Sequence, residues 1–366
     1  MAGSTFGTNF RITTFGESHG KALGVIVDGC PAGLELNEDD IQKYLDRRKP
    51  GQSAYTTKRA ESDTVEILSG VFDGKTTGTP ISLMVRNTDH HSTDYSEIAS
   101  YYRPGHADYT FDEKYGFRDY RGGGRSSGRE TIGRVAAGAI AAKVLATLSI
   151  KIETYAKSIG PVSTENRNDF DINEKNNNPF CMPSKSAASE TKDYLDGIIK
   201  ECNSSGGVIE CVVKGLMPGI GEPVFDKLDA ELAKAVMSIG AVKAFEIGIG
   251  TDAGAATGLE CNDEFIIRDE TIKKATNNAG GTLGGISDGS DLVFRAHVKP
   301  TPSVSATQKT VNKSMNEIDI NIKGRHDPII VPRAVVVVES MAAITVLDLL
   351  MRNMSSKMEN LIKIYK

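Results

Sequence analysis

Alternating apolar and polar positions predict a series of short β-strands, separated by stretches in which apolar residues return at helical spacing. Near the N-terminus, residues 10–14 and 23–28 are expected to form two strands. Asn37 can cap a helix over residues 38–48, and Asp226 can cap another helix later in the chain. Further strands are predicted over residues 149–160 and in the stretches VEILSGVF, ISLMVRN, GGVIECVVKGLMPG, AVKAFEIGIG and DLVFRAHV.

The last long apolar run, VVVVESMAAITVLDLLM, predicts a buried strand followed by a helix over roughly residues 340–360. Glu339, Ser340 and Asp348 interrupt this run. A membrane-spanning helix needs about 20 predominantly apolar residues, so these polar side chains favour a buried position inside the protein.

Two segments of the chain share one pattern of strand, proline-containing turn and helix. GVIVDGCPAG is followed by the predicted helix over 38–48, and VIECVVKGLMPG is followed by the helix that Asp226 would cap. Because a repeated pattern of elements is the sequence sign of a repeated structural unit, an internal duplication is possible.

A glycine-rich stretch from Arg103 to Leu148 is the centre of the predicted functional site. It places His106 after a Pro-Gly pair and then brings three consecutive glycines, followed by Arg125, Ser126 and Ser127, to the start of an apolar helix. The backbone N–H groups at a helix start lack intrahelical partners, and the helix dipole favours negative charge there. The stretch therefore predicts an anion site and a ligand that carries phosphate.

Composition and charge narrow the class of partner. The chain has 366 residues, 39% hydrophobic and 25% charged, as in globular proteins, and a formal net charge of −5, which excludes a general attraction to nucleic acid or an anionic membrane surface. The five cysteines form no C-x-x-C pair, and the first ten residues lack the features of a signal peptide. A reduced, cytoplasmic setting is expected.

Several common motifs are absent or incomplete. GIGTDA fits G-x-G-x-x-A, but loop-like residues follow it, so a Rossmann dinucleotide site is rejected. The loop over 122–131 is not followed by the GK[ST] of a phosphate-binding Walker loop, and there is no G-x-S-x-G elbow. The adjacent His90 and His91 lack the spacing of metal ligands, so no metal site is predicted.

His19 and His106 are the best acid–base candidates because each lies in a glycine-bordered turn beside other polar groups. His297 lies between Ala296 and Val298 in a predicted strand and is expected to be structural. Asp327 is a candidate base, and a salt bridge to Arg325 is its competing interpretation.

Arginines and serines in the loops supply the candidate anion-binding groups. Arg125, Arg129 and Arg325 lie between apolar elements, where a guanidinium suits bidentate binding of carboxylate or phosphate. Ser126 and Ser127 can donate to phosphate oxygens, and simple helix capping, the structural interpretation, is compatible with that role.

Five stretches, FGESHG, RPGHADYT, GGGRSSGRETIGRVAAGA, KPTPS and GRHDP, together resemble the signature stretches of the chorismate synthase family in order and spacing. The resemblance extends from residue 10 to about residue 350. It implies an α/β (α+β) fold, a β-α-β sandwich with central helices flanked by antiparallel sheets. It also implies a single catalytic domain over residues 1–366, assembled as a homotetramer.

The resemblance further implies a lyase that converts 5-enolpyruvylshikimate 3-phosphate to chorismate by anti 1,4-elimination of phosphate, in the shikimate pathway to aromatic amino acids. The family requires reduced FMN although the reaction has no net redox change, because the flavin transiently donates an electron and takes it back. An external flavin reductase would supply reduced FMN, and NADPH would enter only indirectly as the electron source. Neither nucleic acid nor membrane is expected as a partner.

The family's functional residues carry over to matching positions of this chain. His19 would act as the acid toward the leaving phosphate, His106 would protonate the reduced flavin, and Asp327 would help to remove the C6 proton. Substrate or cofactor anions would meet Arg48, Arg103 and Arg129. FMN would be held by Arg125, Ser126, Ser127, Gly240, Ala241, Gly285, Lys299, Pro300, Thr301, Pro302, Ser303 and Arg325.

A few positions depart from the family pattern. Ala54 replaces a basic residue that many members carry, Gly240 replaces a common Asn, and Pro302 stands where Ser is usual. The glycine loops without a strong nucleophile keep a second hypothesis open, namely a non-catalytic regulator that binds a flavin or a nucleotide.

Overall fold

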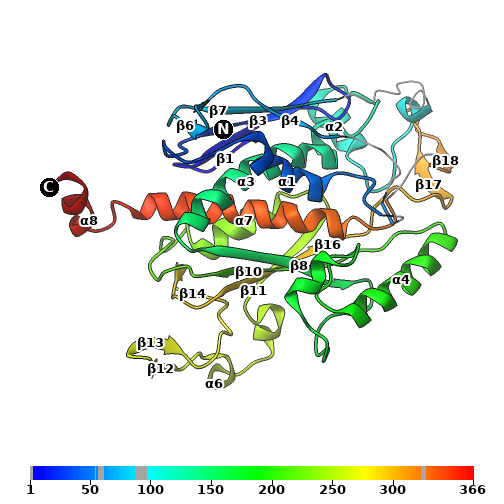
Figure 1. The fold of residues 1–366 in the computed structure, drawn as a ribbon. Coiled ribbons are helices and arrows are strands. Elements are labelled where there is room, and N and C mark those ends of the chain that lie inside the picture. Colours follow the sequence, from blue (N-terminus) through cyan, green and yellow to red (C-terminus); the bar gives the residue numbers. More distant parts are fainter. Residues whose placement is uncertain (1–2, 54, 57–61, 88–96, 323–326) are drawn as a thin grey trace.

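Two five-stranded antiparallel sheets enclose a layer of helices, which confirms the expected β-α-β sandwich (Figure 1). The computed structural model describes residues 3–53, 55–56, 62–87, 97–322 and 327–366. The first sheet has the order β1-β2-β3-β7-β4, formed by Thr5–Phe6, Arg11–Gly16, Ala22–Asp28, Ile81–Arg86 and Val65–Ile67. The second has the order β11-β16-β10-β8-β9, formed by Val242–Ile247, Leu292–Val298, Gly207–Lys214, Lys151–Ile159 and Val162–Ser163.

Helices fill the space between the sheets and border them. They are α1 (Glu38–Arg48), α2 (Asp108–Tyr115), α3 (Thr131–Thr147), α4 (Lys185–Lys200), α5 (Leu228–Met237), α6 (Gly258–Cys261), α7 (Val331–Asn353) and α8 (Met358–Tyr365). Figure 1 shows α1, α3 and α7 between the sheets. Four small hairpins complete the described chain: β5–β6 (Val71–Phe72, Lys75–Thr76), β12–β13 (Phe265–Arg268, Thr271–Lys274), β14–β15 (Thr282–Leu283, Ile286–Ser287) and β17–β18 (Gln308–Val311, Glu317–Ile320).

The alternation that predicted the strands places one face of each sheet against the helix layer. In β10, Ile209, Cys211 and Val213 are fully buried, and their neighbours Val208 and Val212 are less so. In β16, buried and partly buried residues alternate in the same way, with Leu292 and Phe294 in the core. Each sheet therefore has one apolar face, and burial of the two faces against shared helices holds the sandwich together.

The two halves of the sandwich have the same topology. When β1, β9, α2, α4, α6, α8, the 3-10 helices and the small hairpins are left out, the chain order is β2-β3-α1-β4-β7-α3 in the first half and β8-β10-α5-β11-β16-α7 in the second. The strands lie in the orders β2-β3-β7-β4 and β8-β10-β16-β11, and every pairing is antiparallel. The segments whose sequence patterns matched, β3 with α1 and β10 with α5, take equivalent places. This topology supports the predicted duplication.

Helices α3 and α7 cross closely because α3 carries small residues where they meet. A Cβ added to Gly138 would lie 2.2 Å from Cβ of Ser340 and 2.6 Å from its Cα. Both residues are buried, so the neighbouring helix cannot move away without disturbing the core.

Gly138→Ala is expected to destabilise the protein by about 1–3 kcal/mol through overpacking, measured by urea unfolding and far-UV circular dichroism. Gly197→Ala in α4 is the matched control, because no heavy atom lies within 4 Å of the added Cβ. There, alanine is expected to stabilise the protein by about 0.4–1 kcal/mol. Equal stabilities of the two variants would contradict the close crossing.

Three elements differ from the sequence-based expectation. The valine-rich start of the last apolar run is not a strand, because residues Val331–Asn353 form one helix, α7, with Pro332 in its first turn. Its burial between the sheets outweighs the strand preference of valine. Helix α2 was not predicted. Asp226 does not cap α5, whose N-cap is Lys227, and it pairs instead with Arg352 at 2.6 Å.

Among the described residues, α7 is long and apolar enough to cross a membrane by length and composition. Most of its apolar stretch is buried inside the protein, as is usual for a core helix of a globular domain. Glu339 in its middle pairs with Arg47 through two hydrogen bonds of 2.8 and 2.6 Å.

Candidate active site

His106 lies against the loop that follows β16. Its Nε2 is 3.0 Å from Oγ of Ser303, and its Nδ1 is 3.0 Å from the carbonyl oxygen of Pro104. Nζ of Lys299 donates to the carbonyl oxygen of Gly105 at 3.2 Å. The histidine turn and residues 299–303, which are almost 200 positions apart, therefore form one wall of the site.

The loop over 299–303 is held from two sides. The backbone N–H of Lys299 donates to the carbonyl oxygen of Ala241 at 2.9 Å. Oγ of Ser204 donates to the carbonyl oxygen of Thr301 at 2.7 Å. Ala241 has a φ of 73°, and no heavy atom lies within 4 Å of the place that a Cβ on Gly240 would take. The segment over 240–241 thus exposes its backbone beside this loop.

Arg103 supports the histidine turn electrostatically. Asp108 accepts from its Nε and from an Nη, each at 2.8 Å, and Arg118 approaches the same carboxylate at 3.4 Å. Burial acts to raise the pKa of Asp108, but hydrogen bonds and charge from Arg103 outweigh it and lower that pKa. Burial, and next the charge of Arg103, lower the pKa of His106.

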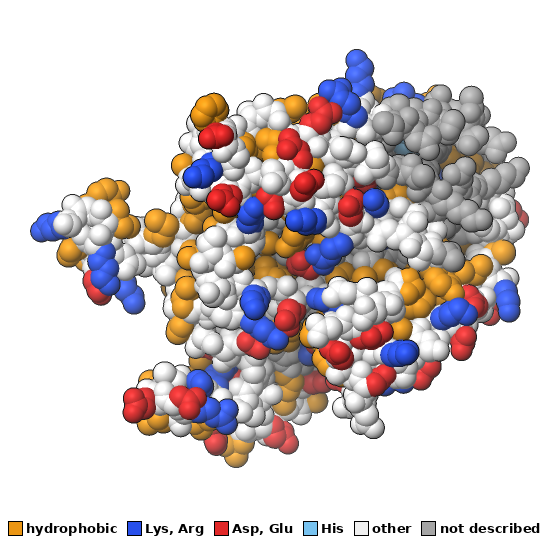
Figure 2. Space-filling model, in the orientation of Figure 1, with side chains coloured by type: hydrophobic (Ala, Val, Ile, Leu, Met, Phe, Trp, Pro, Cys, Tyr) orange, Lys and Arg blue, Asp and Glu red, His pale blue; other side chains and the backbone are white. Residues whose placement is uncertain are grey.

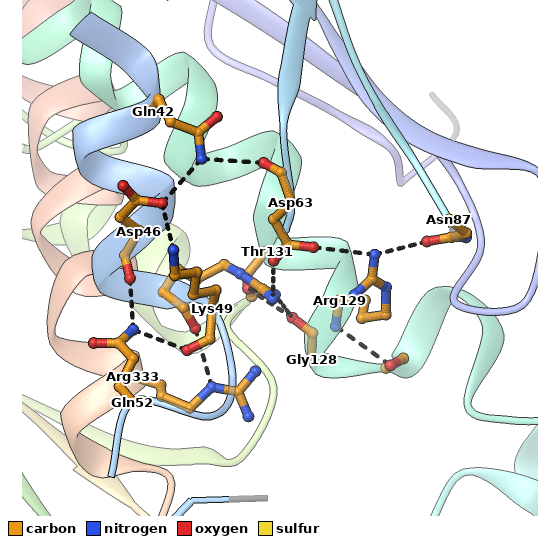
Figure 3. A network of polar contacts seen from close by, with 12 residues as sticks. Gln42, Asp46, Lys49, Gln52, Asp63, Asn87, Gly128, Arg129, Thr131 and Arg333 are labelled. Carbon is orange, nitrogen blue, oxygen red and sulfur yellow. Dashed lines mark hydrogen bonds and ion pairs between the residues drawn. The ribbon is translucent and has the colours of Figure 1, made fainter. Parts of the chain in front are cut away.

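Arg48 and Arg129 meet at a buried carboxylate, Asp63. Figure 3 shows Arg129 between Asp63 and Asn87. An Nη of Arg48 donates to Asp63 at 2.8 Å, and an Nη of Arg129 lies 3.2 Å from the other carboxylate oxygen. Arg48 is 1% and Asp63 2% exposed. Burial lowers the pKa of Arg48 to about 10, against the opposing effect of Asp63, so this guanidinium remains charged at neutral pH.

Asp63 has a φ of 46°, in the left-handed region that Asp tolerates better than most residues. This conformation aims its carboxylate between α1 and the start of α3, while its carbonyl oxygen accepts from Nε2 of Gln42 at 3.3 Å. Strained backbone at a buried charged group is common at functional sites.

The turn that carries His19 is attached to Arg129 through Asn87. The amide nitrogen of Asn87 donates to the carbonyl oxygens of Glu17 and Gly20, and its oxygen accepts from Arg129 at 2.7 Å. Nδ1 of His19 is 3.0 Å from Oγ of Ser18. His19 and Arg129 therefore belong to one network.

Asp327 and Arg333 extend the network to the start of α7. An Nη of Arg333 donates to Asp327 at 2.8 Å, and its Nε donates to the carbonyl oxygen of Arg48 at 3.0 Å. Pro328, the residue after Asp327, connects this network to the wall around His106. Its carbonyl oxygen accepts from the backbone N–H of Ser205 at 2.9 Å. Ser205 follows Ser204, which holds the 299–303 loop.

The loop before α3 lies on the edge of this network. An Nη of Arg125 donates to Oγ1 of Thr14 in β2 at 2.6 Å, so its side chain attaches the loop to β2. Oγ of Ser126 donates to the carbonyl oxygen of Gly123, and Oγ of Ser127 accepts from the N–H of Arg129. Both hydroxyls therefore cap turns, a role that is compatible with donation to phosphate oxygens.

Comparisons with known proteins give the family. A sequence model described as chorismate synthase matches residues 10–351. The chain belongs to the chorismate synthase family. It is 66% identical to the chorismate synthase of Agathobacter rectalis over 366 residues, the full length of both chains. The chorismate synthase of Methanococcoides burtonii is 54% identical over 355 residues, covering 96% of this chain and 97% of its own.

A solved crystal structure of chorismate synthase has 33% sequence identity and a TM-score of 0.78, and the match covers 98% of this chain and 96% of the other. The fold expected from the family resemblance is thus the fold of this chain.

The structure brings most of the residues expected from the chorismate synthase resemblance to one region. Arg48, Arg129, Asp327 and the His19 turn form one network, and His106, Gly240, Ala241 and residues 299–303 form the adjoining wall. Arg103 faces Asp108 behind His106. Arg325, Ala54, His90 and His91 lie outside the described residues.

Gly285, which was also expected to bind FMN, lies apart from these residues in the structure. It lies in the β14–β15 hairpin, and its carbonyl oxygen accepts from the N–H of Leu228, at the start of α5. Gly240 follows the other end of α5, about 15 Å away along a helix of ten residues.

Sequence reasoning missed three residues of the network: Asp63, Asn87 and Arg333. Asp63 lies in a polar stretch that resembles a surface loop, and Asn87 ends the predicted strand ISLMVRN, with polar residues on both sides of it. Arg333 precedes the valine run that was expected to begin as a strand, so its position on the first turn of α7 was not predicted. For Arg333, the only indication in the sequence was that it lies close to the family motif GRHDP.

Proposed function

We propose that the protein converts 5-enolpyruvylshikimate 3-phosphate to chorismate and inorganic phosphate, as a single catalytic domain over the whole chain. The observation that carries this proposal is the group of Arg48, Arg129 and Arg333 around two carboxylates beside the His19 turn. The substrate has one phosphate and two carboxylates, and clustered guanidiniums suit such anions.

In the elimination, a proton leaves C6 and the electron pair of the C6–H bond forms a C6=C1 double bond. The ring double bond shifts from C1=C2 to C2=C3, and the bond from C3 to the phosphate oxygen breaks with its electron pair leaving on phosphate. His19 would donate a proton to the leaving phosphate, and Asp327 would take part in removing the C6 proton. The contact between Asp327 and Arg333 keeps this carboxylate at the network, and Asn87 keeps the His19 turn there.

Reduced FMN fits the wall around His106. Gly124, Gly128 and Gly240 have no heavy atom within 4 Å of an added Cβ, so a ligand can approach their backbone. Oγ1 of Thr301 is buried without a hydrogen-bond partner among the described residues, which leaves it available to a ligand. Residues 125–127, 240–241 and 299–303 would hold the cofactor, together with Arg325. Reduced FMN, when bound there, would supply an electron for the loss of phosphate and recover it within the same turnover.

The test is phosphate release. Purified protein with photoreduced FMN under anaerobic conditions should release phosphate from 5-enolpyruvylshikimate 3-phosphate, and oxidised FMN should support no turnover. Absence of release with reduced FMN would contradict the proposal. Stoichiometric binding of FMN without turnover would favour the rival hypothesis of a non-catalytic flavin-binding regulator.

The same proposal includes a cytoplasmic homotetramer that receives reduced FMN from an external reductase, with NADPH as the indirect electron source. Two projecting elements support association. Ile267 and Ile272 on the β12–β13 hairpin are 84% and 77% exposed, and Tyr365 on α8 is 81% exposed. Figure 2 shows hydrophobic side chains on both elements.

A further inference from the structure

Asn87 is the first residue after β7, and its side chain contacts two parts of the site at once. Its amide nitrogen donates to the carbonyl oxygen of Glu17 at 3.0 Å and to that of Gly20 at 2.8 Å. Its amide oxygen accepts from an Nη of Arg129 at 2.7 Å. Only one orientation of the amide satisfies all three contacts, since carbonyl oxygens need a donor and a guanidinium needs an acceptor.

The two carbonyl groups are the ends of the turn that presents His19. The N–H of Gly20 donates to the carbonyl oxygen of Glu17 at 3.0 Å and closes this turn. The backbone N–H of Asn87 also donates to the carbonyl oxygen of Lys21 at 3.1 Å. Asn87 thus holds both ends of the turn and the residue that follows it.

The histidine ring has little freedom to compensate for a shift of this turn. A Cβ added to Gly122 would lie 2.2 Å from Nδ1 of His19, so the ring rests directly on the glycine-rich loop. Arg129, on the other side of Asn87, is fixed by Asp63 at 3.2 Å. The amide of Asn87 therefore sets the position of the histidine turn relative to the arginine.

We propose that Asn87 is a positioning residue, which holds His19 at the distance from Arg129 that a phosphate bound by the arginines requires. This inference rests on the proposed function, in which His19 protonates the leaving phosphate. Proton transfer needs heavy atoms about 2.6–3.2 Å apart, and a misplacement of about 1 Å can lower a rate 100-fold.

Two variants separate the two contacts of Asn87. Asn87→Asp has the same shape and keeps an acceptor for Arg129, but it loses both donors and turns a carboxylate toward two carbonyl oxygens. Its kcat should fall by about 10- to 100-fold, with the substrate KM within about threefold of the wild type. Asn87→Ala loses the contact with Arg129 as well, so its KM should also rise, by about tenfold or more.

A second measurement reports on the turn without turnover. Hydrogen–deuterium exchange of the ligand-free protein should be faster in residues 16–22 of both variants, whereas residues 128–131 should change only in Asn87→Ala. Asn173→Ala, an exposed position on the 3-10 helix Ile172–Asn176, is the control and should match the wild type in all measurements. Circular dichroism and the midpoint of thermal unfolding establish that each variant is folded.

A kcat of Asn87→Asp within threefold of the wild type, or unchanged exchange over residues 16–22 in both variants, would overturn the inference. A wild-type protein that releases no phosphate would contradict the proposed function instead, and the exchange measurement would still decide whether Asn87 holds the turn.

Discussion

His106→Ala is expected to lower kcat by about 10²–10⁴-fold, the usual contribution of a general acid or base. His106 is held between the carbonyl oxygen of Pro104 and Oγ of Ser303, which fixes its ring at the wall that would bind the flavin. Phosphate release with photoreduced FMN measures kcat, and titration of FMN measures whether the cofactor still binds.

The control for this substitution is His297→Ala. His297 lies on β16, and its Nε2 is 3.1 Å from the carboxylate of Glu246, away from the contacts that define the site. Its removal should leave kcat within threefold of the wild type, and His106→Ala should retain FMN binding. A loss below threefold in His106→Ala would remove His106 from the mechanism.

The pH dependence of stability gives a separate readout for the same variant. Burial and Arg103 lower the pKa of His106 in the folded protein, so the unfolded chain binds this proton more tightly. Stability should therefore rise as the pH increases from the lowered pKa to about 6.5. The same stability should be lost when the pH decreases through this range. The difference in unfolding free energy between the wild type and His106→Ala should shrink from about pH 7.5 to pH 5, measured without ligands.

Asp63→Asn is expected to destabilise the protein by about 3–5 kcal/mol, because it leaves a buried guanidinium without its counter-charge. The side chains of Arg48 and Asp63 are 2% and 1% exposed, and their contact is 2.8 Å long. Since the chain has no tryptophan, urea unfolding is best followed by far-UV circular dichroism.

An exposed ion pair is the appropriate comparison for Asp63. Glu66 and Arg86 pair at 2.9 Å with side chains that are 41% and 65% exposed. Glu66→Gln should change the free energy of unfolding by less than about 1 kcal/mol. If Asp63→Asn cost no more than that, other groups would have to neutralise Arg48.

Much of the architecture could be predicted because it depends on local patterns. The alternation of apolar and polar residues predicted the strands, and Asn37 predicted the start of α1. In the structure, Asn37 forms a full capping box with Asp40. Helix α7 could not be predicted in full, since its valines prefer strands and only burial between two sheets makes them helical. Helix α2 has few buried side chains, so its sequence carries little helical periodicity.

The site was predictable only where a residue stands in a recognisable motif. His19, His106 and Arg129 lie in glycine-rich stretches with family signatures. Asp63 and Asn87 do not, and their roles come from contacts with residues 15 and 42 positions away, respectively. Such contacts depend on how the sheets and helices pack, which no local pattern contains.

The equal topology of the two halves has a consequence for the origin of the site. Arg48 ends α1, Asn87 follows β7 and Arg129 precedes α3, while Gly240 follows α5, Lys299 follows β16 and Asp327 precedes α7. These are the same three positions in each half. Each half of the sandwich therefore contributes its three equivalent positions to one site. The two halves fill these positions with different side chains, so the site is symmetric in topology and asymmetric in chemistry: Arg48, Asn87 and Arg129 in the first half, and Gly240, Lys299 and Asp327 in the second.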